Sequence, residues 1–207
     1  SLLILHGRYF TTLAFVEIDE KGERRFSFSR KMSADTQLCE SELDWELLKK
    51  CKIFHFGSLS LADEPARTAT IAAVKAAKAA GAVISYDPNY RASLWRNEKS
   101  AVEQMKSVIP FVDMMKVSEE ELVLLTEMED YHQAAAQILA WGPKLLAVTL
   151  GSEGVLIAMA QEQEKIAGFK VQVVDTTGAG DSFWGGLLRE YLRKSKNLQE
   201  LTWDEVK

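Results

Sequence analysis

The chain has 207 residues, of which 47% are hydrophobic, so it can bury one substantial core and carry a small appendage. Its formal net charge of −5 argues against nucleic acid or an anionic membrane as partner, because both bind basic surfaces. Cys39 and Cys51 form no CxxC arrangement, which excludes a zinc ribbon or disulfide framework and favours a reducing cytoplasm. No run is long enough to span a bilayer and none resembles a signal peptide, so we expect a soluble protein.

The first predicted element is a β-hairpin. Residues 11–18 are β-branched and aromatic, residues 19–24 are turn-like, and residues 25–30 alternate Phe26 and Phe28 with serines. An isolated two-stranded ribbon is marginal in water, so this hairpin needs further strands or a partner surface.

From about Asp44 onward, strands alternate with helices. The expected strands are 51–60, 82–87, 114–117, 145–150, 154–160 and 170–175, and the expected helices are 64–81, 100–112, 118–127, 131–142 and 182–193. The strand runs are apolar throughout, which is typical of a sheet covered on both faces. We therefore predict an α/β sandwich with a mainly parallel sheet at 44–207, and a lid hairpin with its connection at 1–43.

A glycine loop, Thr176–Asp181, follows the last of these expected strands and opens a helix. Gly178 and Gly180 allow backbone angles that direct successive N–H groups into one small space, where the helix N-terminus adds positive potential. The pattern therefore predicts a phosphoryl-binding site, with Asp181 ionised in the first helical turn.

A carboxylate beside an anion cradle repels the bound phosphate unless a hydroxyl group lies between them. Asp181 would then deprotonate that alcohol as it attacks a phosphoryl group, while the amides stabilise the transferred charge. The loop alone leaves open that Thr177 or Asp181 simply caps the helix. A Walker A loop is excluded because no Gly-Lys pair is present in that context, and Phe183 replaces the third glycine of a dinucleotide fingerprint.

Residues 174–188, VDTTGAGDSFWGGLL, resemble the second signature of the PfkB carbohydrate kinases. The segments TTLAFVEID, SADTQL, HFGSLSL, YDPNYRASLW, KVSEEEL and VTLGSEG extend the resemblance over nearly the whole chain, and several are similar to bacterial fructokinases. The resemblance implies a ribokinase-like three-layer αβα sandwich with a small β lid. It also implies that segments of the family fold are missing at both ends of this chain.

The same resemblance assigns roles in the glycine loop. It makes Asp181 the catalytic base and the amides of Gly178, Ala179 and Gly180 the anion hole. It also places Asp175 and Thr177 at a monovalent-cation site, usually occupied by potassium.

Three polar residues, Asp87, Asn89 and Arg91, lie at or just past the end of the expected strand at 82–87, at the edge where open α/β sheets bind ligands. The resemblance makes Asp87 and Arg91 substrate- or phosphate-binding residues and Asn89 a nucleotide contact. The alternative is a Pro-Asn turn with a solvated arginine.

Ser118 and Glu121 occupy the place of the family's Asn-x-x-Glu, with serine in place of asparagine. Glu121 would help to hold Mg²⁺ through water. The pattern S-x-x-E is also a capping box, so both residues could serve only to start a helix.

Two further segments have assigned roles. VTLGSEG resembles the family's nucleotide-binding turn, with Thr149, Gly151 and Gly154 near the ribose and phosphates, although alone it reads as a loop between strands. Asp35 follows the hairpin and is expected to face the sugar pocket or, equally, to be an exposed loop aspartate.

The activity that the resemblance implies is phosphorylation of a sugar hydroxymethyl group by Mg-ATP, with fructose favoured as the sugar and potassium as a further cofactor. The alternatives are a 2-keto-3-deoxygluconate kinase, a ribokinase, or a truncated and inactive member of the family that acts by association. A homodimer through the β lid is the expected assembly.

Overall fold

The computed structural model describes residues 4–18, 24–160, 162–173, 175–194 and 196–206. The chain forms two compact units, each described by itself below. The first is Ser1–Ile84 with Pro88–Phe111, and the second is Ser85–Asp87 with Val112–Lys207. These units do not separate a lid from a core. The expected boundary between the lid at 1–43 and the core at 44–207 therefore stays a prediction.

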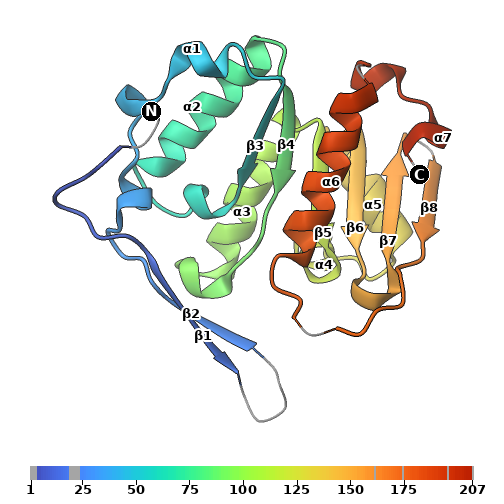
Figure 1. Ribbon diagram of the computed structural model, residues 1–207, viewed down its shortest axis with the longest axis horizontal. Helices are drawn as coiled ribbons and strands as arrows, with labels where there is room; N and C mark the ends of the chain where they lie inside the picture. The colour runs from blue at the N-terminus through green and yellow to red at the C-terminus, as the bar shows by residue number, and fades with distance from the viewer. Residues whose placement is uncertain (1–3, 19–23, 161, 174, 195, 207) are drawn as a thin grey trace. The chain divides into compact units, whose positions relative to one another are not determined.

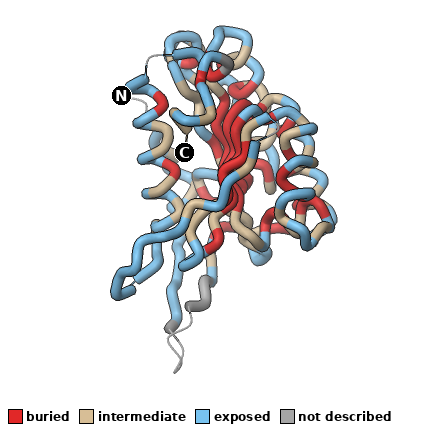
Figure 2. Tube along the Cα trace, turned by 90° about the vertical axis from the view of Figure 1, so that its right-hand side faces the viewer, coloured by how far each residue is buried: buried red, intermediate tan, exposed pale blue. Residues whose placement is uncertain are grey.

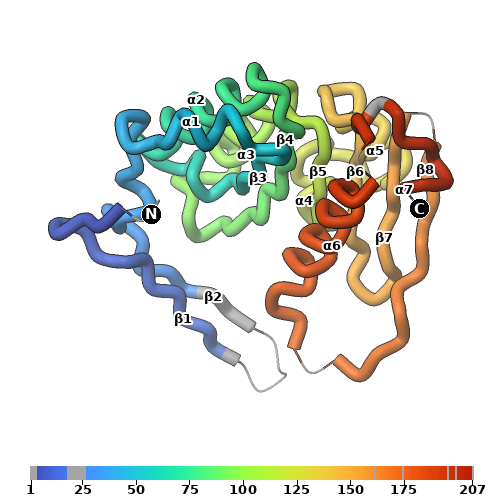
Figure 3. Tube along the Cα trace, turned by 45° about the horizontal axis from the view of Figure 1, so that its top comes forward, coloured from blue at the N-terminus to red at the C-terminus, as the bar shows by residue number. Residues whose placement is uncertain are grey.

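The lid of the first unit is a two-stranded antiparallel sheet of β1 (Leu13–Ile18) and β2 (Arg24–Ser29) (Figure 1). Its register pairs Phe15 with Ser27. The predicted hairpin is therefore confirmed, while its turn residues 19–23 lie outside the described ranges. In Figure 3 the two strands run side by side at the blue end of the chain.

The rest of the first unit is α-helical around two strands. It contains α1 (Trp45–Leu48), β3 (Ile53–Gly57), α2 (Ala66–Ala79), the start of β4 (Val83–Asp87) and α3 (Glu98–Val108). The α2 residues Ala69, Ala73 and Ala77 recur every four positions and are at most 3% exposed. This stripe of small side chains lets the helix pack closely on its neighbours.

The second unit continues the sheet and carries the later helices. Its elements are the end of β4, β5 (Met114–Ser118), α4 (Glu119–Thr126), α5 (Tyr131–Ala140), β6 (Leu145–Thr149), β7 (Val155–Met159), β8 (Glu162–Ile166), α6 (Ala179–Lys194) and α7 (Trp203–Val206). Short 3₁₀ turns occur at Ala34–Gln37, Glu40–Glu42, Leu59–Leu61, Ala92–Leu94, Ile109–Phe111, Gly151–Glu153 and Leu198–Glu200.

The larger sheet has the strand order β3-β4-β5-β6-β7-β8. The pairs β4–β5 and β5–β6 are parallel, whereas β6–β7 and β7–β8 are antiparallel. The predicted mainly parallel sheet is therefore confirmed, with antiparallel strands at the β8 edge.

Helices cover both faces of the sheet in the second unit. In Figure 1, α6 lies in front of the strands and α4 and α5 lie behind them, so the unit has three layers. Adjacent residues of β5 and β6, such as Met114 with Met115 and Leu145 with Leu146, are at most 1% exposed. Figure 2 shows this burial as a continuous run along the strands. The apolar strand runs predicted this two-sided covering correctly.

The predicted strand at 170–175 is wrong. Residues 170–173 and 175 form no strand, and position 174 lies outside the described residues. The sheet edge is taken by β8, which pairs with β7 in register from Val155–Ile166 to Met159–Glu162. β8 has the polar sequence EQEKI, so its hydrophobic pattern did not predict a strand. Its backbone N–H and C=O groups are instead satisfied by pairing with β7. In contrast, the apolar residues Val171 and Val173 are 71% and 63% exposed.

None of the helices in the described ranges is both long and apolar enough to cross a membrane.

Candidate active site

The glycine loop of the second unit turns the chain directly into α6. Gly178 has φ +76°, a conformation that favours glycine, and a Cβ there would meet no atom within 4 Å. The Asp175 carboxylate accepts a hydrogen bond from the Thr177 N–H at 2.6 Å, and the Ser182 N–H donates to the Gly178 carbonyl at 2.8 Å. The requirement for glycine at position 178 is therefore one of backbone conformation.

The loop presents backbone donors at the start of the helix. Within the described residues, the N–H groups of Gly178, Gly180 and Asp181 have no acceptor, as expected for the first turn of a helix. The Ala179 N–H instead donates to the Thr176 carbonyl at 3.1 Å. Of the amides at positions 178–181, that of Ala179 therefore already has an acceptor, and an anion cradle formed by these amides stays a prediction.

The Asp181 side chain lies in the first turn of α6 and is exposed. In the described part of the chain, no other side chain donates a hydrogen bond to its carboxylate. A free carboxylate beside free N–H groups is the pairing that general-base catalysis at a phosphoryl acceptor requires.

A buried ion pair lies against the same loop. Lys116, in β5, donates from Nζ to Asp87 Oδ2 at the end of β4, at 3.0 Å. Both residues are less than 9% exposed. A Cβ on Gly180 would lie 3.0 Å from the same Nζ, so Gly180 makes room for the lysine. Sequence reasoning did not single out Lys116, although a lysine inside the apolar run MMKV was a usable signal.

Helix α6 is anchored to the sheet by Trp184. Its indole Nε1–H donates to Ser85 Oγ in β4 at 2.9 Å, and Trp184 is 2% exposed. Trp184 lies three residues after Asp181, on nearly the same side of the helix. Trp184 is therefore a packing residue, and its hydrogen bond fixes the start of α6 on β4.

Ser118 and Glu121 form the capping box that starts α4. The Ser118 hydroxyl accepts from the Glu121 N–H at 3.2 Å, and Glu121 Oε2 accepts from the Ser118 N–H at 2.8 Å. These two bonds confirm the capping box, and a magnesium role for Glu121 stays a prediction.

Tyr86, at the end of β4, has a raised phenol pKa. Its burial raises this pKa well above the ordinary value, and the negative charges of Glu121 and Asp87 raise it further.

The turn after β6 requires glycine for packing. Gly154 has φ +103°, and a Cβ there would come within 2.0 Å of the Ile166 carbonyl oxygen. Gly151 has φ +56°, with open space around its Cα, and the Thr149 hydroxyl donates to the Val117 carbonyl at 3.4 Å. The contacts at position 154 require glycine whether or not a nucleotide binds there. The nucleotide-binding roles of Thr149, Gly151 and Gly154 therefore stay predictions.

Asn89 and Arg91 belong to the first unit. Asn89 adopts φ +47°, a left-handed conformation that asparagine tolerates. Arg91 Nη1 donates to the Tyr90 carbonyl at 2.9 Å. Their ligand roles stay predictions.

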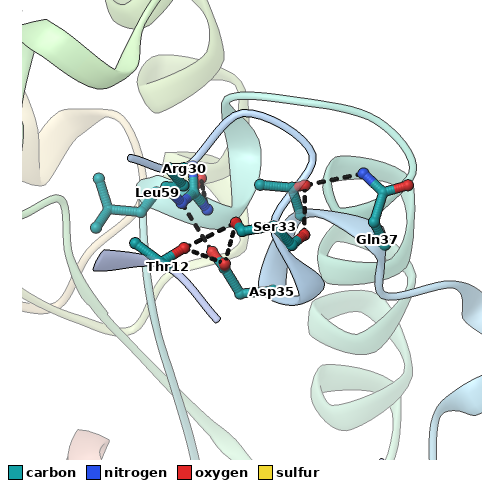
Figure 4. A network of polar contacts seen from close by, with 7 residues as sticks. Thr12, Arg30, Ser33, Asp35, Gln37 and Leu59 are labelled. Carbon is teal, nitrogen blue, oxygen red and sulfur yellow. Dashed lines mark hydrogen bonds and ion pairs between the residues drawn. The ribbon is translucent and has the colours of Figure 1, made fainter. Parts of the chain in front are cut away.

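Asp35, also in the first unit, is the centre of a polar network at the base of the lid (Figure 4). Arg30 Nε donates to Asp35 Oδ2 at 2.7 Å, and the Thr12 and Ser33 hydroxyls both lie within hydrogen-bonding distance of Oδ1. Partial burial alone would raise the pKa of Asp35, but the hydrogen bonds from Ser33 and Thr12 and the charge of Arg30 lower it overall. This network gives Asp35 a structural role, while its contact with a sugar stays a prediction.

Within the described residues, no group of three or more histidine, cysteine, aspartate or glutamate side chains could hold a metal ion by itself.

Comparison with known proteins identifies the family. Residues 6–202 match the pfkB family of carbohydrate kinases. Probable fructokinase-6, chloroplastic, from Arabidopsis thaliana is 47% identical over 192 residues, which cover 92% of this chain and 50% of that protein. Fructokinase-1 from Zea mays is 45% identical over 192 residues, which cover 92% of this chain and 59% of that protein.

The fold matches solved fructokinases. The Vibrio cholerae O395 enzyme in its fructose, ADP and calcium-bound form is 34% identical with a TM-score of 0.80, covering 89% of this chain and 59% of that one. A double mutant of that enzyme, in a fructose, ADP and potassium-bound form, is 32% identical with a TM-score of 0.85, covering 97% and 63%. The chain thus spans between half and two thirds of the length of these relatives. It belongs to the pfkB family of carbohydrate kinases, with the ribokinase-like α/β fold.

Proposed function

We propose that this chain carries the catalytic centre of an ATP-dependent sugar kinase that phosphorylates a hydroxymethyl group, with fructose as the preferred sugar. The observation that carries the proposal is the exposed Asp181 carboxylate beside the free N–H groups of Gly178, Gly180 and Asp181. Membership of the family and the fructokinase names of its relatives support the substrate class.

In the proposed reaction, the sugar hydroxyl lies between Asp181 and the γ-phosphoryl group of ATP. Its proton passes to the Asp181 carboxylate as a new bond forms between the sugar oxygen and the γ-phosphorus. The bond from that phosphorus to the β,γ-bridging oxygen breaks, and ADP leaves with the electron pair. The free N–H groups at the start of α6 stabilise the negative charge on the transferred group.

Two cations accompany the nucleotide in this proposal. Mg²⁺, bound with ATP, neutralises charge on the phosphate oxygens, and we assign Glu121 to its water shell and Asp175 with Thr177 to a potassium ion. Their oxygen donors suit these hard cations. Because the Glu121 carboxylate already caps α4, it suits a contact through water better than direct coordination. Of the two solved relatives above, one contains a bound calcium ion and the other a bound potassium ion.

The remaining predicted contacts complete the proposed sites. We assign Thr149, Gly151, Gly154 and Asn89 to the nucleotide, and Asp35 and Arg91 to the sugar or its phosphoryl group. Cys39 and Cys51 are both free thiols, which supports the proposal of a reducing, cytoplasmic setting. The chloroplast is the alternative compartment, because one relative is a chloroplastic probable fructokinase.

A second candidate function is association through the lid, without catalysis. The lid residues Leu13, Phe15 and Val16 are 51–53% exposed, which is unusual for adjacent apolar side chains on so small a sheet. A second copy of the chain would cover this surface. Analytical ultracentrifugation of the chain tests it, and a monomer at all concentrations contradicts it.

A coupled ADP-release assay with fructose, ribose and 2-keto-3-deoxygluconate tests the proposed activity. We expect turnover with fructose, and we expect Asp181→Asn to lower kcat by about 10²–10⁴-fold while nucleotide binding persists, since only the proton acceptor is removed. Asp63→Asn, at an exposed position of the first unit, is the matched control and should retain activity. Absence of turnover with every sugar, or full activity of Asp181→Asn, contradicts the proposal.

A further inference from the structure

Five consecutive residues between β8 and the glycine loop are all exposed. Residues 169–173 have the sequence FKVQV, in which apolar and polar side chains alternate. Phe169 is 95% exposed, Val171 71% and Val173 63%. In the described part of the chain, no backbone N–H or C=O group of this segment makes a hydrogen bond to another residue. Both its apolar side chains and its backbone groups are therefore available for an interaction.

The alternation in this segment is typical of a β-strand with one covered face. In an extended conformation, Phe169, Val171 and Val173 lie on one side of the backbone. Lys170 and Gln172 then lie on the other side. The segment forms no strand in this chain, because β8 takes the place beside β7. What it lacks is a neighbouring strand, since a strand needs a partner to complete its hydrogen bonds.

The sheet edge formed by β8 is protected against pairing with another chain. β8 carries Glu162, Glu164 and Lys165, and charged side chains on an edge strand oppose edge-to-edge association. Antiparallel pairing of two copies of β8 around its centre would place Glu164 opposite Glu164, and like charges directly opposite are destabilising. Of the two segments, 169–173 is therefore the one suited to pairing.

The segment is complementary to itself in the antiparallel direction. When two copies pair around Val171, Phe169 of each copy lies opposite Val173 of the other, and the two Val171 side chains are opposite each other. Lys170 then lies opposite Gln172. A pairing centred on Lys170 would instead place two lysines opposite each other. The register centred on Val171 therefore shields all three apolar side chains and brings no like charges together.

We propose that residues 169–173 of two copies of this chain pair as an antiparallel ribbon centred on Val171. The pairing is isologous, so it closes at a dimer. Five residues from each chain form a small interface, which belongs to the weak and transient class. This surface differs from the lid residues Leu13, Phe15 and Val16, and the inference does not depend on the proposed kinase activity.

Analytical ultracentrifugation from micromolar to millimolar concentrations tests the association. We expect a reversible equilibrium between monomer and dimer. Val171→Lys places two like charges opposite each other and should raise the dissociation constant of the dimer about tenfold or more. Leu192→Lys is the matched control, because it adds the same charge at an exposed apolar position of α6 and should leave the constant nearly unchanged. A monomer at all concentrations, species larger than a dimer, or equal effects of the two substitutions overturn the proposal.

Phe15→Lys separates this surface from the lid. Phe15 lies in β1, so its substitution should leave the proposed dimer intact. If Phe15→Lys abolishes the dimer and Val171→Lys does not, the association occurs through the lid and the proposal is wrong. Circular dichroism of each variant verifies folding, which the exposure of Val171 and Phe15 favours.

Cross-linking tests the register directly. In a chain whose free thiols are removed by Cys39→Ser and Cys51→Ser, Val171→Cys should form an intermolecular disulfide on mild oxidation. Directly opposite residues of an antiparallel pair have Cα atoms within the range that a disulfide spans. Val173→Cys is the matched control, because its two copies would lie four residues, or roughly 13 Å, apart along the ribbon. Mixing Phe169→Cys with Val173→Cys should restore cross-linking. Equal cross-linking of Val171→Cys and Val173→Cys, each alone, overturns the proposed pairing.

Discussion

Each of the two units contains an aspartate paired with a cation, and the two pairs differ in how fully the aspartate is buried. In the lid network, Arg30 donates both to Asp35 and to the Leu59 carbonyl, and the Asp35 side chain is 48% exposed. In the second unit, the Lys116 and Asp87 side chains are 10% and 6% exposed. A carboxylate that is shielded from water depends on its cation more than one that is half exposed.

The largest effect expected from this contrast is on the buried pair. Asp87→Ala leaves the Lys116 ammonium group buried without its carboxylate, which should lower the free energy of unfolding by about 3–5 kcal/mol. Urea denaturation followed by tryptophan fluorescence measures it, because Trp184 is buried in the same unit. Asp35→Ala should cost much less, since its side chain is half exposed. Equal losses in the two variants would remove the distinction between the pairs.

A smaller loss is expected where α6 is anchored. Trp184→Phe keeps most of the buried ring but removes the Nε1–H donor to Ser85, so it should lower the free energy of unfolding by about 1–2 kcal/mol. If the anchor positions the cradle, the affinity for inorganic tripolyphosphate, measured by calorimetry, should fall as well. Trp203→Phe, in the short α7, provides the matched control. Unchanged affinity in a destabilised Trp184→Phe would limit the anchor to a role in stability.

A change of similar size is expected from the turn at Gly178. Gly178→Ala meets no steric obstacle but forces alanine to adopt φ +76°, which should cost about 1–2 kcal/mol. Gly185→Ala is the control, because Gly185 lies inside α6 with open space around it, and alanine favours a helix. Thermal denaturation compares the two variants, and a loss at Gly185 as large as that at Gly178 would refute the conformational argument.

The smallest effect concerns pH and the lid. The folded-state pKa of Asp35 lies below its ordinary value of 3.8, so its network contributes stability above that value. This contribution is lost as the pH falls through the lowered folded-state pKa. Asp35→Asn should therefore be less stable than the wild type at pH 7, with the difference shrinking below pH 3.8. Urea titrations across this range measure it, and a difference that is independent of pH would contradict the ionised state of Asp35.

Periodicity in the sequence was sufficient for most of the fold. Apolar runs such as 145–150 predicted buried strands, and the alanine-rich run before Gly81 predicted α2. The failure at 170–175 has a physical cause, because a strand needs a neighbour to complete its hydrogen bonds and the polar segment 162–166 already pairs with β7. Strand propensity therefore could not decide which of two consecutive segments enters the sheet.

For the site, the amino-acid sequence by itself determined the glycine loop, the aspartate that follows it and the family. Those features depend on local backbone chemistry, which neighbouring residues dictate. Only the tertiary structure decided that the Ala179 N–H donates to the Thr176 carbonyl, that Asp87 pairs with Lys116, and that this lysine lies against Gly180. The latter two contacts join positions 29 and 64 residues apart, and the register of β4 on β5 and the docking of α6 on the sheet bring them together.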